Sequence, residues 1–330
     1  MEQRNLDGAY AYCETVCRNA STTFYSSFSA LQPDKRRAVH AVYALCRWVD
    51  DIVDGDEEPT ILETHELRLA TDERQRIVSE IHAGASPSLS SDEHRRRMMA
   101  LVDIRLKLHA ASEQRITSDD HPIFIALQDV FERYTIKLND FETVIEGMED
   151  DLYPVANKTW DELRSYCYKV ASAVGLILIE IYGYEDRASR LHAIDLGIQM
   201  QLINVLRDIN EDMERGRIYL PLDILASHNI TTEMLRSGNI ANTLAWKGFI
   251  VEYVEVIKRH QSSANQLFGY LDGRARVQPE IMADAYTSIL NEIVRRSGDV
   301  FTQPVRLSTL RKALLGVRLS LRKLRARIFA

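Results

Sequence analysis

The stretch AVHAVYALCRWVDDIVD, residues 38–54, decides the fold class of this chain of 330 residues. Its apolar residues recur three or four positions apart, which is the period of an amphipathic α-helix. They are Val39, Val42, Leu45, Val49 and Val53. Gln32-Pro33-Asp34 precedes the stretch and Gly55 follows it, so common signals for helix start and stop bound it. We therefore predict one long helix.

A polar stripe runs along the same expected helix, with spacings of four, three and four residues. It consists of Tyr43, Arg47, Asp50 and Asp54. The acids lie near the C-terminal end, where the helix dipole disfavours negative charge. Bound Mg²⁺ would offset this cost, because it prefers oxygen ligands and is often held by carboxylates together with a substrate phosphate. The alternative is a solvent-facing stripe with no ligand.

A second polar stripe lies in QLINVLRDINEDMERGRIYLP, residues 201–221. Gln201, Asn204, Asp208 and Asp212 follow at spacings of three, four and four, so we expect them on one helical face. All four offer oxygen atoms, and Arg207 flanks them. Two such stripes, each beside an arginine, indicate a shared site where Mg²⁺ bridges to a diphosphate. Two independent solvated stripes are the alternative.

Helical periodicity also dominates the rest of the chain, for example in WDELRSYCYKVASAVGLILIEIYG and AIDLGIQMQLINVLRDI. No alternating strand pattern is sustained. We predict an all-α fold in a single domain, 1–330, with ten to twelve helices. The segment from about 71 to 120 is charged and weakly periodic, and we expect a surface excursion there.

The composition is that of an ordinary globular protein, with 45% apolar residues, 27% charged residues and a net charge of −7. The sequence has no run of about 18 apolar residues, so we predict no transmembrane helix. The N-terminus has neither an apolar signal core nor a basic transit pattern. The four cysteines form no CxxC pattern, which favours reduced thiols and a cytoplasmic location. We expect no nucleic-acid partner.

In combination, these motifs resemble the trans-isoprenyl diphosphate head-to-head synthases, the family of phytoene, dehydrosqualene and squalene synthases. The resemblance runs in order through ASTTFYSSFSALQPDKRRAVHAVYALCRWVDDIVD, FETVIEGMEDDL, LRSYCYKVASAVG and QLINVLRDINEDMERGRIYLP. It implies an all-α fold around a central cavity. It also implies Mg²⁺-dependent condensation of two allylic isoprenyl diphosphates through a cyclopropylcarbinyl diphosphate.

The resemblance assigns roles to individual residues. Those that would bind Mg²⁺ are Asp50, Asp54, Asn204, Asp208 and Asp212. Those that would lie at the diphosphates are Ser21, Thr22, Thr23, Tyr43, Arg47, Gln201 and Arg207, with Tyr219 and Tyr286 close by. Those that would line the hydrocarbon tunnel are Phe24, Phe28, Val170, Val174, Gly175 and Leu176, which the residue pattern alone assigns to the core. The four aspartates, both arginines and Tyr219 form the expected catalytic set. Ser172 stands where the family more usually has glycine, and would narrow the tunnel if it faces inward.

The identity of the substrate is less sharply predicted. General resemblance favours geranylgeranyl diphosphate and phytoene. The alternative is farnesyl diphosphate, giving presqualene diphosphate, dehydrosqualene or squalene. No GxG occurs, which disfavours a nicotinamide step, but squalene synthases bind NADPH without that motif, so NADPH stays an alternative. A non-catalytic assembly factor of the same fold is a further alternative, although such proteins typically lose the aspartates kept here.

The final segment, residues 306–330, carries eight basic residues and no acid, with Leu and Val at helical spacing. Such a basic amphipathic segment is expected to contact an anionic membrane surface, which would place the protein peripherally on a membrane. A terminal helix packed on an acidic body is the alternative. The oligomeric state is not predicted by the sequence.

Overall fold

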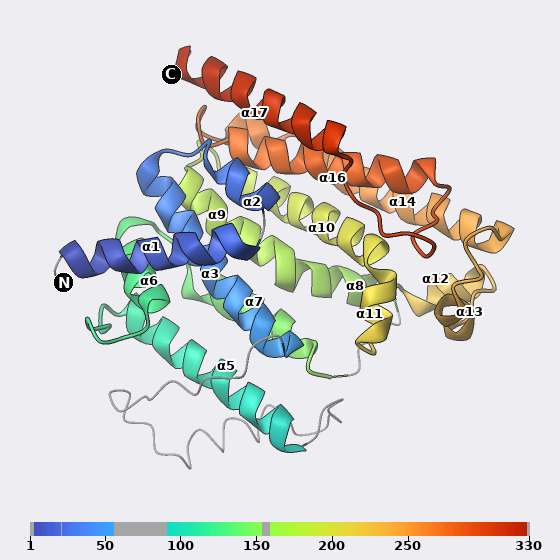
Figure 1. Cartoon of the computed structure of the whole chain (residues 1–330), viewed down its shortest axis with the longest axis horizontal. Helices are drawn as coiled ribbons and strands as arrows, with labels where there is room; N and C mark the ends of the chain where they lie inside the picture. The colour runs from blue at the N-terminus through green and yellow to red at the C-terminus, as the bar shows by residue number, and fades with distance from the viewer. Residues whose placement is uncertain (1–2, 21, 56–90, 154–158, 329–330) are drawn as a thin grey trace. The chain divides into compact units, whose positions relative to one another are not determined.

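The computed structural model describes residues 3–20, 22–55, 91–153 and 159–328 (Figure 1). Sixteen α-helices and one π-helix lie in these residues, and no strand does, so the predicted all-α fold is confirmed. The helices outnumber the ten to twelve expected because four of them are only four to six residues long. Contacts divide the chain into two compact units, Met1–Pro154 and Val155–Ala330. The single domain expected from the sequence stays a prediction.

The predicted long helix is the centre of the first unit. Helix α3 (Pro33–Asp54) begins at its proline and ends before Gly55, whose φ of 81° is left-handed. All five apolar residues of the opening stretch are 3% exposed or less. Helix α2 (Thr22–Phe28) packs on α1, and the helices that pack on α3 are α1 (Gln3–Ala20), α5 (Ser91–Ser112), α6 (Pro122–Arg133) and α7 (Leu138–Asp150).

Helix α5 lies in the core of the first unit, and not in the surface excursion expected for about 71–120. Its fully buried apolar side chains include Met98, Leu101 and Leu108. Its periodicity is weak because charged side chains are buried on it as well. Lys107 pairs with Asp120, and Arg105 donates to both carboxylate oxygens of Glu149 at 2.9 and 2.6 Å. Opposite charges make such burial tolerable. Residues 71–90 of the expected excursion lie outside the described part.

Helix α10 (Ser189–Arg207) is the centre of the second unit, and the short α11 (Ile209–Glu214), α12 (Leu222–Ser227) and α13 (Thr232–Ser237) follow it. The elements that pack on α10 are α8 (Trp160–Cys167), the π-helix η1 (Tyr168–Ser172), α9 (Ala173–Tyr182), α14 (Leu244–Ala264), α15 (Leu267–Tyr270) and α16 (Val277–Arg295). The second acidic motif therefore lies at the C-terminal end of the central helix of its unit.

The elements α8, η1 and α9 form one uninterrupted helical segment, Trp160–Tyr182. Within the described residues, it is the one segment that is long and apolar enough to cross a membrane by length and composition. Of its most apolar window, 44% is buried. A core helix meets the same criteria, and this segment packs along α10.

The C-terminal segment forms helix α17 (Thr309–Ile328), which lies along α16 (Figure 1). Basic residues of α17 pair with three acids of α16 at 3.1–3.5 Å. The pairs are Arg311 with Glu292, Arg318 with Asp284, and Arg322 with both Glu280 and Asp284. One face of the basic helix is therefore held on an acidic surface of its own unit.

Candidate active site

The first acidic motif is organised around one arginine of α3. The Arg47 guanidinium pairs with Asp50 at 3.3 Å and also with Asp51, one position further along. The Asp51 side chain is 16% exposed and that of Asp50 is 46% exposed. One cation thus offsets two carboxylates at the end of the helix where negative charge is disfavoured. Asp51 has no place in the polar stripe, yet it is the acid nearest to Arg47.

Three of the predicted substrate residues form one aromatic cluster. The Tyr43 ring lies 5.8 Å from Phe24 and 6.0 Å from Phe28, between ring centroids, and the two phenylalanines lie 6.4 Å apart. Burial raises the pKa of Tyr43 to about 12, so its phenol keeps its proton at neutral pH. The cluster lies one helical turn before Arg47. It therefore combines apolar surface with one hydroxyl close to the acidic motif.

The segment before this cluster is only partly described. Helix α2 begins at Thr22, so the backbone of Thr22 and Thr23 forms its first turn. Ser21 lies outside the described residues. The diphosphate contacts predicted for these three residues stay predictions.

The C-terminal end of α3 is held by a residue that the sequence reasoning missed. Arg97 of α5 is 8% exposed and donates to the Val53 carbonyl oxygen at 2.7 Å. Its guanidinium also pairs with Glu93. The Arg97 side chain also lies against Gly55, whose φ of 81° favours glycine at this position. Arg97 therefore holds the Val53 carbonyl, one residue before Asp54, the last residue of the helix.

The backbone of the second acidic motif differs from the single helix that we predicted. Helix α10 ends at Arg207, and Asp208 has φ −102° and ψ 15°, which are not helical values. Two hydrogen bonds nevertheless preserve the helical spacing. The Asp208 N–H donates to the Asn204 carbonyl at 2.9 Å, and the Asp212 N–H donates to the Asp208 carbonyl at 2.9 Å. The three residues therefore still follow one another at one-turn intervals across the break.

Asn204 carries the clearest sign of a ligand at this motif. Its side-chain nitrogen donates to Gln201 Oε1 at 3.2 Å. Its Oδ1 atom is buried and has no hydrogen-bond partner. A buried polar atom without a partner is costly and needs an explanation. An amide oxygen one turn from a carboxylate suits a hard cation, which binds through oxygen.

Arg207 is bound to the carboxylate that follows it. Its Nε and Nη2 atoms donate to the two Asp208 oxygens at 2.7 and 2.5 Å, a fork geometry that suits arginine. Burial alone would lower the pKa of Arg207, but the Asp208 carboxylate and Tyr286 outweigh it and raise that pKa. Burial raises the pKa of Tyr286, and the nearby Arg207 and Asn204 offset part of this rise. Tyr286 of α16 thus lies close to Arg207 and Asn204 of the second motif.

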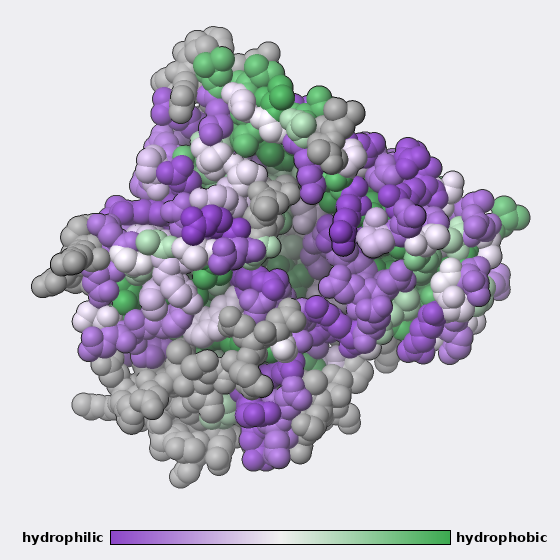
Figure 2. Space-filling view, in the orientation of Figure 1, coloured by the Kyte–Doolittle hydropathy of each residue, from purple (hydrophilic) through white to green (hydrophobic). Residues whose placement is uncertain are grey.

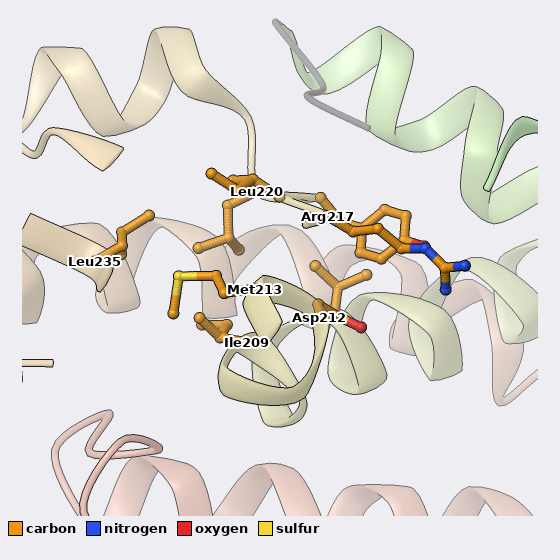
Figure 3. Close-up of a pocket in the computed structure, with 9 residues that line it drawn as sticks. Ile209, Asp212, Met213, Arg217, Leu220 and Leu235 are labelled. Atoms are coloured by element: carbon orange, nitrogen blue, oxygen red, sulfur yellow. The ribbon is translucent and has the colours of Figure 1, made fainter. Parts of the chain in front are cut away.

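Asp212 and Tyr219 line a small pocket (Figure 3). The pocket has a volume of about 10 Å³, which is room for one water molecule and not for a diphosphate. Met213 and Leu235 close its apolar end, and the Arg217 guanidinium extends away from that end (Figure 3). The Tyr219 ring is 5% exposed and stacks on Tyr166 at 4.6 Å. The Tyr219 ring therefore forms one buried side of the pocket that Asp212 also lines.

The residues predicted to line the tunnel include part of a π-helix, a form that often marks functional sites. Val170, Val174 and Gly175 are half-buried and Leu176 is 2% exposed, and the tunnel-lining role of all four stays a prediction. Ser172 is fully buried. Its hydroxyl donates to the Ile194 carbonyl at 2.8 Å, because η1 lies directly against α10.

Each acidic motif contributes its own set of oxygen donors. Among the described residues, no group of three or more His, Cys, Asp or Glu side chains lies close enough together to hold a metal ion. Each motif instead combines carboxylates with an arginine, and the second adds the Asn204 amide oxygen. These groups fit a cation that takes further oxygen ligands from a bound phosphate.

An all-α fold that carries helical acidic motifs, each paired with an arginine, is consistent with the isoprenoid synthase class that the sequence motifs predict. More specifically, the chain belongs to the squalene/phytoene synthase family, whose model matches residues 17–311. It is therefore a prenyltransferase, and the family expected from the sequence motifs is confirmed.

Relatives match along almost the whole chain. The chloroplastic phytoene synthase 2 of Solanum lycopersicum is 29% identical, over 94% of this chain and 89% of the relative. The phytoene synthase of Arthrospira platensis is 30% identical, over 97% of this chain and 94% of the relative. A dehydrosqualene synthase crystallised with a ligand has a TM-score of 0.76 at 24% identity, covering 96% of this chain and 97% of that one. A squalene synthase from Alicyclobacillus acidocaldarius has a TM-score of 0.72 at 22% identity, covering 90% and 97%. The two solved structures are evidence for the fold.

Proposed function

We propose that this prenyltransferase condenses two molecules of geranylgeranyl diphosphate head to head and releases phytoene, with Mg²⁺ as its cofactor. The chain length of the substrate is supported by relatives named phytoene synthase that cover 94% and 97% of this chain. The reaction class follows from the family. The likeness to dehydrosqualene and squalene synthases is one of fold, because the identities are 24% and 22%.

The observation that carries the proposal is the unsatisfied Oδ1 atom of Asn204, one turn before Asp208. We assign Asn204, Asp208 and Asp212 to Mg²⁺, with the remaining ligands coming from diphosphate and water. Asp50 and Asp54 would hold Mg²⁺ at the first motif. When bound, these ions would stabilise the negative charge that develops on the leaving diphosphate.

The arginines have a second role in this proposal. In the structure, Arg47 pairs with Asp50 and Asp51, and Arg207 pairs with Asp208. If Asp208 turned its oxygens toward a bound cation, the Arg207 guanidinium would be released and could donate to diphosphate oxygens instead. An arginine that can stabilise the negative charge of the leaving group therefore lies beside each motif before the substrate binds.

The carbon chemistry needs an apolar environment, because water would quench an allylic carbocation. The half-buried Val170, Val174 and Gly175 are proposed to line the hydrocarbon tunnel with Phe24 and Phe28. Tyr43 joins these rings to the diphosphate site. Since its pKa is raised to about 12, its phenol is protonated and can donate a hydrogen bond to a diphosphate oxygen. Gln201, Tyr219 and Tyr286 are proposed to complete the diphosphate site.

In this mechanism, ionisation of the first substrate gives an allylic cation and diphosphate. The alkene of the second substrate attacks the cation, and loss of one proton from the resulting carbocation closes the ring of a cyclopropylcarbinyl diphosphate. A second ionisation, rearrangement and proton loss give the 1-1′ linked product. Hydride delivery in place of proton loss would give the reduced product, which would require NADPH.

The proposal is tested by incubating the purified protein with Mg²⁺ and either geranylgeranyl or farnesyl diphosphate, each with and without NADPH. Mass analysis of the extracted hydrocarbon identifies the product. We expect phytoene from geranylgeranyl diphosphate, no effect of NADPH, and no product after Mg²⁺ is chelated. Product from farnesyl diphosphate alone would replace the assigned substrate. Turnover of neither substrate would favour a non-catalytic assembly factor.

A further inference from the structure

Helix α17 exposes a continuous apolar stripe along the face that does not contact α16. Four of its large apolar side chains are 53–56% exposed, at spacings of three, four and three residues. They are Leu314, Val317, Leu321 and Leu324. Figure 2 shows hydrophobic side chains gathered along this helix. Contiguous exposed apolar residues on one helical face indicate an interaction surface, whereas single exposed ones do not.

The other face of α17 fixes the orientation of this stripe. Leu315 is 8% exposed, and the arginines at positions 311, 318 and 322 pair with α16. These residues lie about 80–140° around the helix from the centre of the stripe, at about 100° per residue. Arg311 also donates to the Ser288 carbonyl at 2.9 Å. The helix is therefore anchored through its basic side and presents its leucines outward.

The charges around the stripe identify the kind of partner. Residues 306–330 carry eight basic residues and no acid, in a chain whose net charge is −7. Lys312 is exposed, and the side chain of Arg318 is 61% exposed even though it pairs with Asp284. Leucines flanked by basic residues are typical of helices that lie at the surface of anionic lipid. A second copy of the chain is a poorer partner, because a symmetric contact would bring two basic helices together.

We propose that the stripe Leu314, Val317, Leu321 and Leu324 docks on the surface of an anionic lipid bilayer, with α17 lying parallel to that surface. The leucines enter the acyl boundary, and the basic residues beside them contact the lipid phosphates. Helix α16 then connects this contact to α10, which ends at the second acidic motif. The surface chemistry alone supports this docking, whichever diphosphate the enzyme condenses.

The test is co-sedimentation of the full chain with vesicles of phosphatidylglycerol and phosphatidylcholine in equal parts, without substrate. We expect the wild-type protein to bind these vesicles, to bind pure phosphatidylcholine more weakly, and to be released by salt. Leu321→Glu should weaken binding at least about tenfold, since it replaces a buried apolar side chain of the stripe by a negative charge at an anionic surface. Val251→Glu is the matched control, because Val251 is 65% exposed on helix α14. It should bind like the wild type.

Three results would overturn the proposal. The first is wild-type protein that does not bind the anionic vesicles. The second is Leu321→Glu that binds as tightly as Val251→Glu. The third is self-association in sedimentation velocity that Leu321→Glu abolishes while vesicle binding is absent, which would assign the stripe to a second copy. Leu314→Glu repeats the test in case the first variant is unstable, and circular dichroism checks that each variant is folded. Condensation measured in detergent solution should be unchanged, which separates this proposal from the assignment of the reaction.

Discussion

The contact between α10 and the π-helix can be tested by adding one methyl group, in the variant Gly197→Ala. A Cβ atom at Gly197 would lie 2.6 Å from both the Cα and the N atom of Ser172. Both are backbone atoms, so no side-chain rotation relieves the clash. Relief requires η1 to move away from α10 by about 1 Å, the difference from an ordinary carbon contact of about 3.5–4 Å.

The expected cost can be worked from three contributions. Overpacking typically costs about 1–3 kcal/mol. The movement also stretches the 2.8 Å hydrogen bond from Ser172 to the Ile194 carbonyl, which is worth about 1 kcal/mol. Replacing a helical glycine by alanine returns about 1 kcal/mol. The free energy of unfolding should therefore fall by about 1–3 kcal/mol.

The assay is urea unfolding followed by circular dichroism, with Gly316→Ala as the control. Gly316 also lies within a helix of the second unit, but nothing lies within 4 Å of its added Cβ atom, so that variant should not be destabilised. Ser172→Ala should not rescue Gly197→Ala, because the backbone contacts remain. A Gly197→Ala variant within about 0.5 kcal/mol of the wild type would refute the close packing of these two helices.

Two further predictions concern the first unit. Arg97→Gln should raise the Mg²⁺ concentration for half-maximal activity about tenfold, because it removes the hydrogen bond to Val53 that positions the end of α3. Arg97→Lys should restore part of the Mg²⁺ affinity. An unchanged Mg²⁺ titration in Arg97→Gln would show that Arg97 does not support the site. Burial lowers the pKa of His40 from 6.5 to about 4, so the unfolded chain binds more protons between these values. This contribution to stability is complete above pH 6.5 and is lost as the pH falls toward 4, by at most about 3 kcal/mol. The free energy of unfolding, measured by urea titration at several pH values in this range, should depend less on pH in His40→Gln than in the wild type. Equal pH dependence in the two proteins would contradict the prediction.

The sequence predicts those parts of the fold that depend on neighbouring residues. The bounds of α3 follow from Pro33 and Gly55, because each residue restricts or permits the local backbone conformation that starts or stops a helix. The polar stripes follow from helical spacing. Helix α5 is not predicted correctly, because its buried charges are stabilised by partners far away in sequence, such as Arg105 by Glu149. The charged residues of this segment therefore suggest a surface position, although they are paired in the core.

The same distinction holds at the candidate site. Arg97 reaches the Val53 carbonyl across 44 residues, and no local pattern links them. The contact of Ser172 with Gly197 is likewise visible only when two helices are packed. The unsatisfied oxygen of Asn204 is a property of its surroundings and not of its spacing. Sequence spacing therefore finds the ligand candidates, and packing reveals what holds them.

The most direct measurement is the rate of phytoene formation by Asp208→Asn at saturating Mg²⁺, compared with the wild type. The substitution keeps the size of the side chain and removes the charge that would bind the cation and that holds Arg207. We expect the rate to fall at least about a hundredfold while the helical content is unchanged. Asp50→Asn should behave in the same way at the first motif. A rate near that of the wild type in Asp208→Asn would contradict the assignment of the acidic motifs to Mg²⁺ and diphosphate.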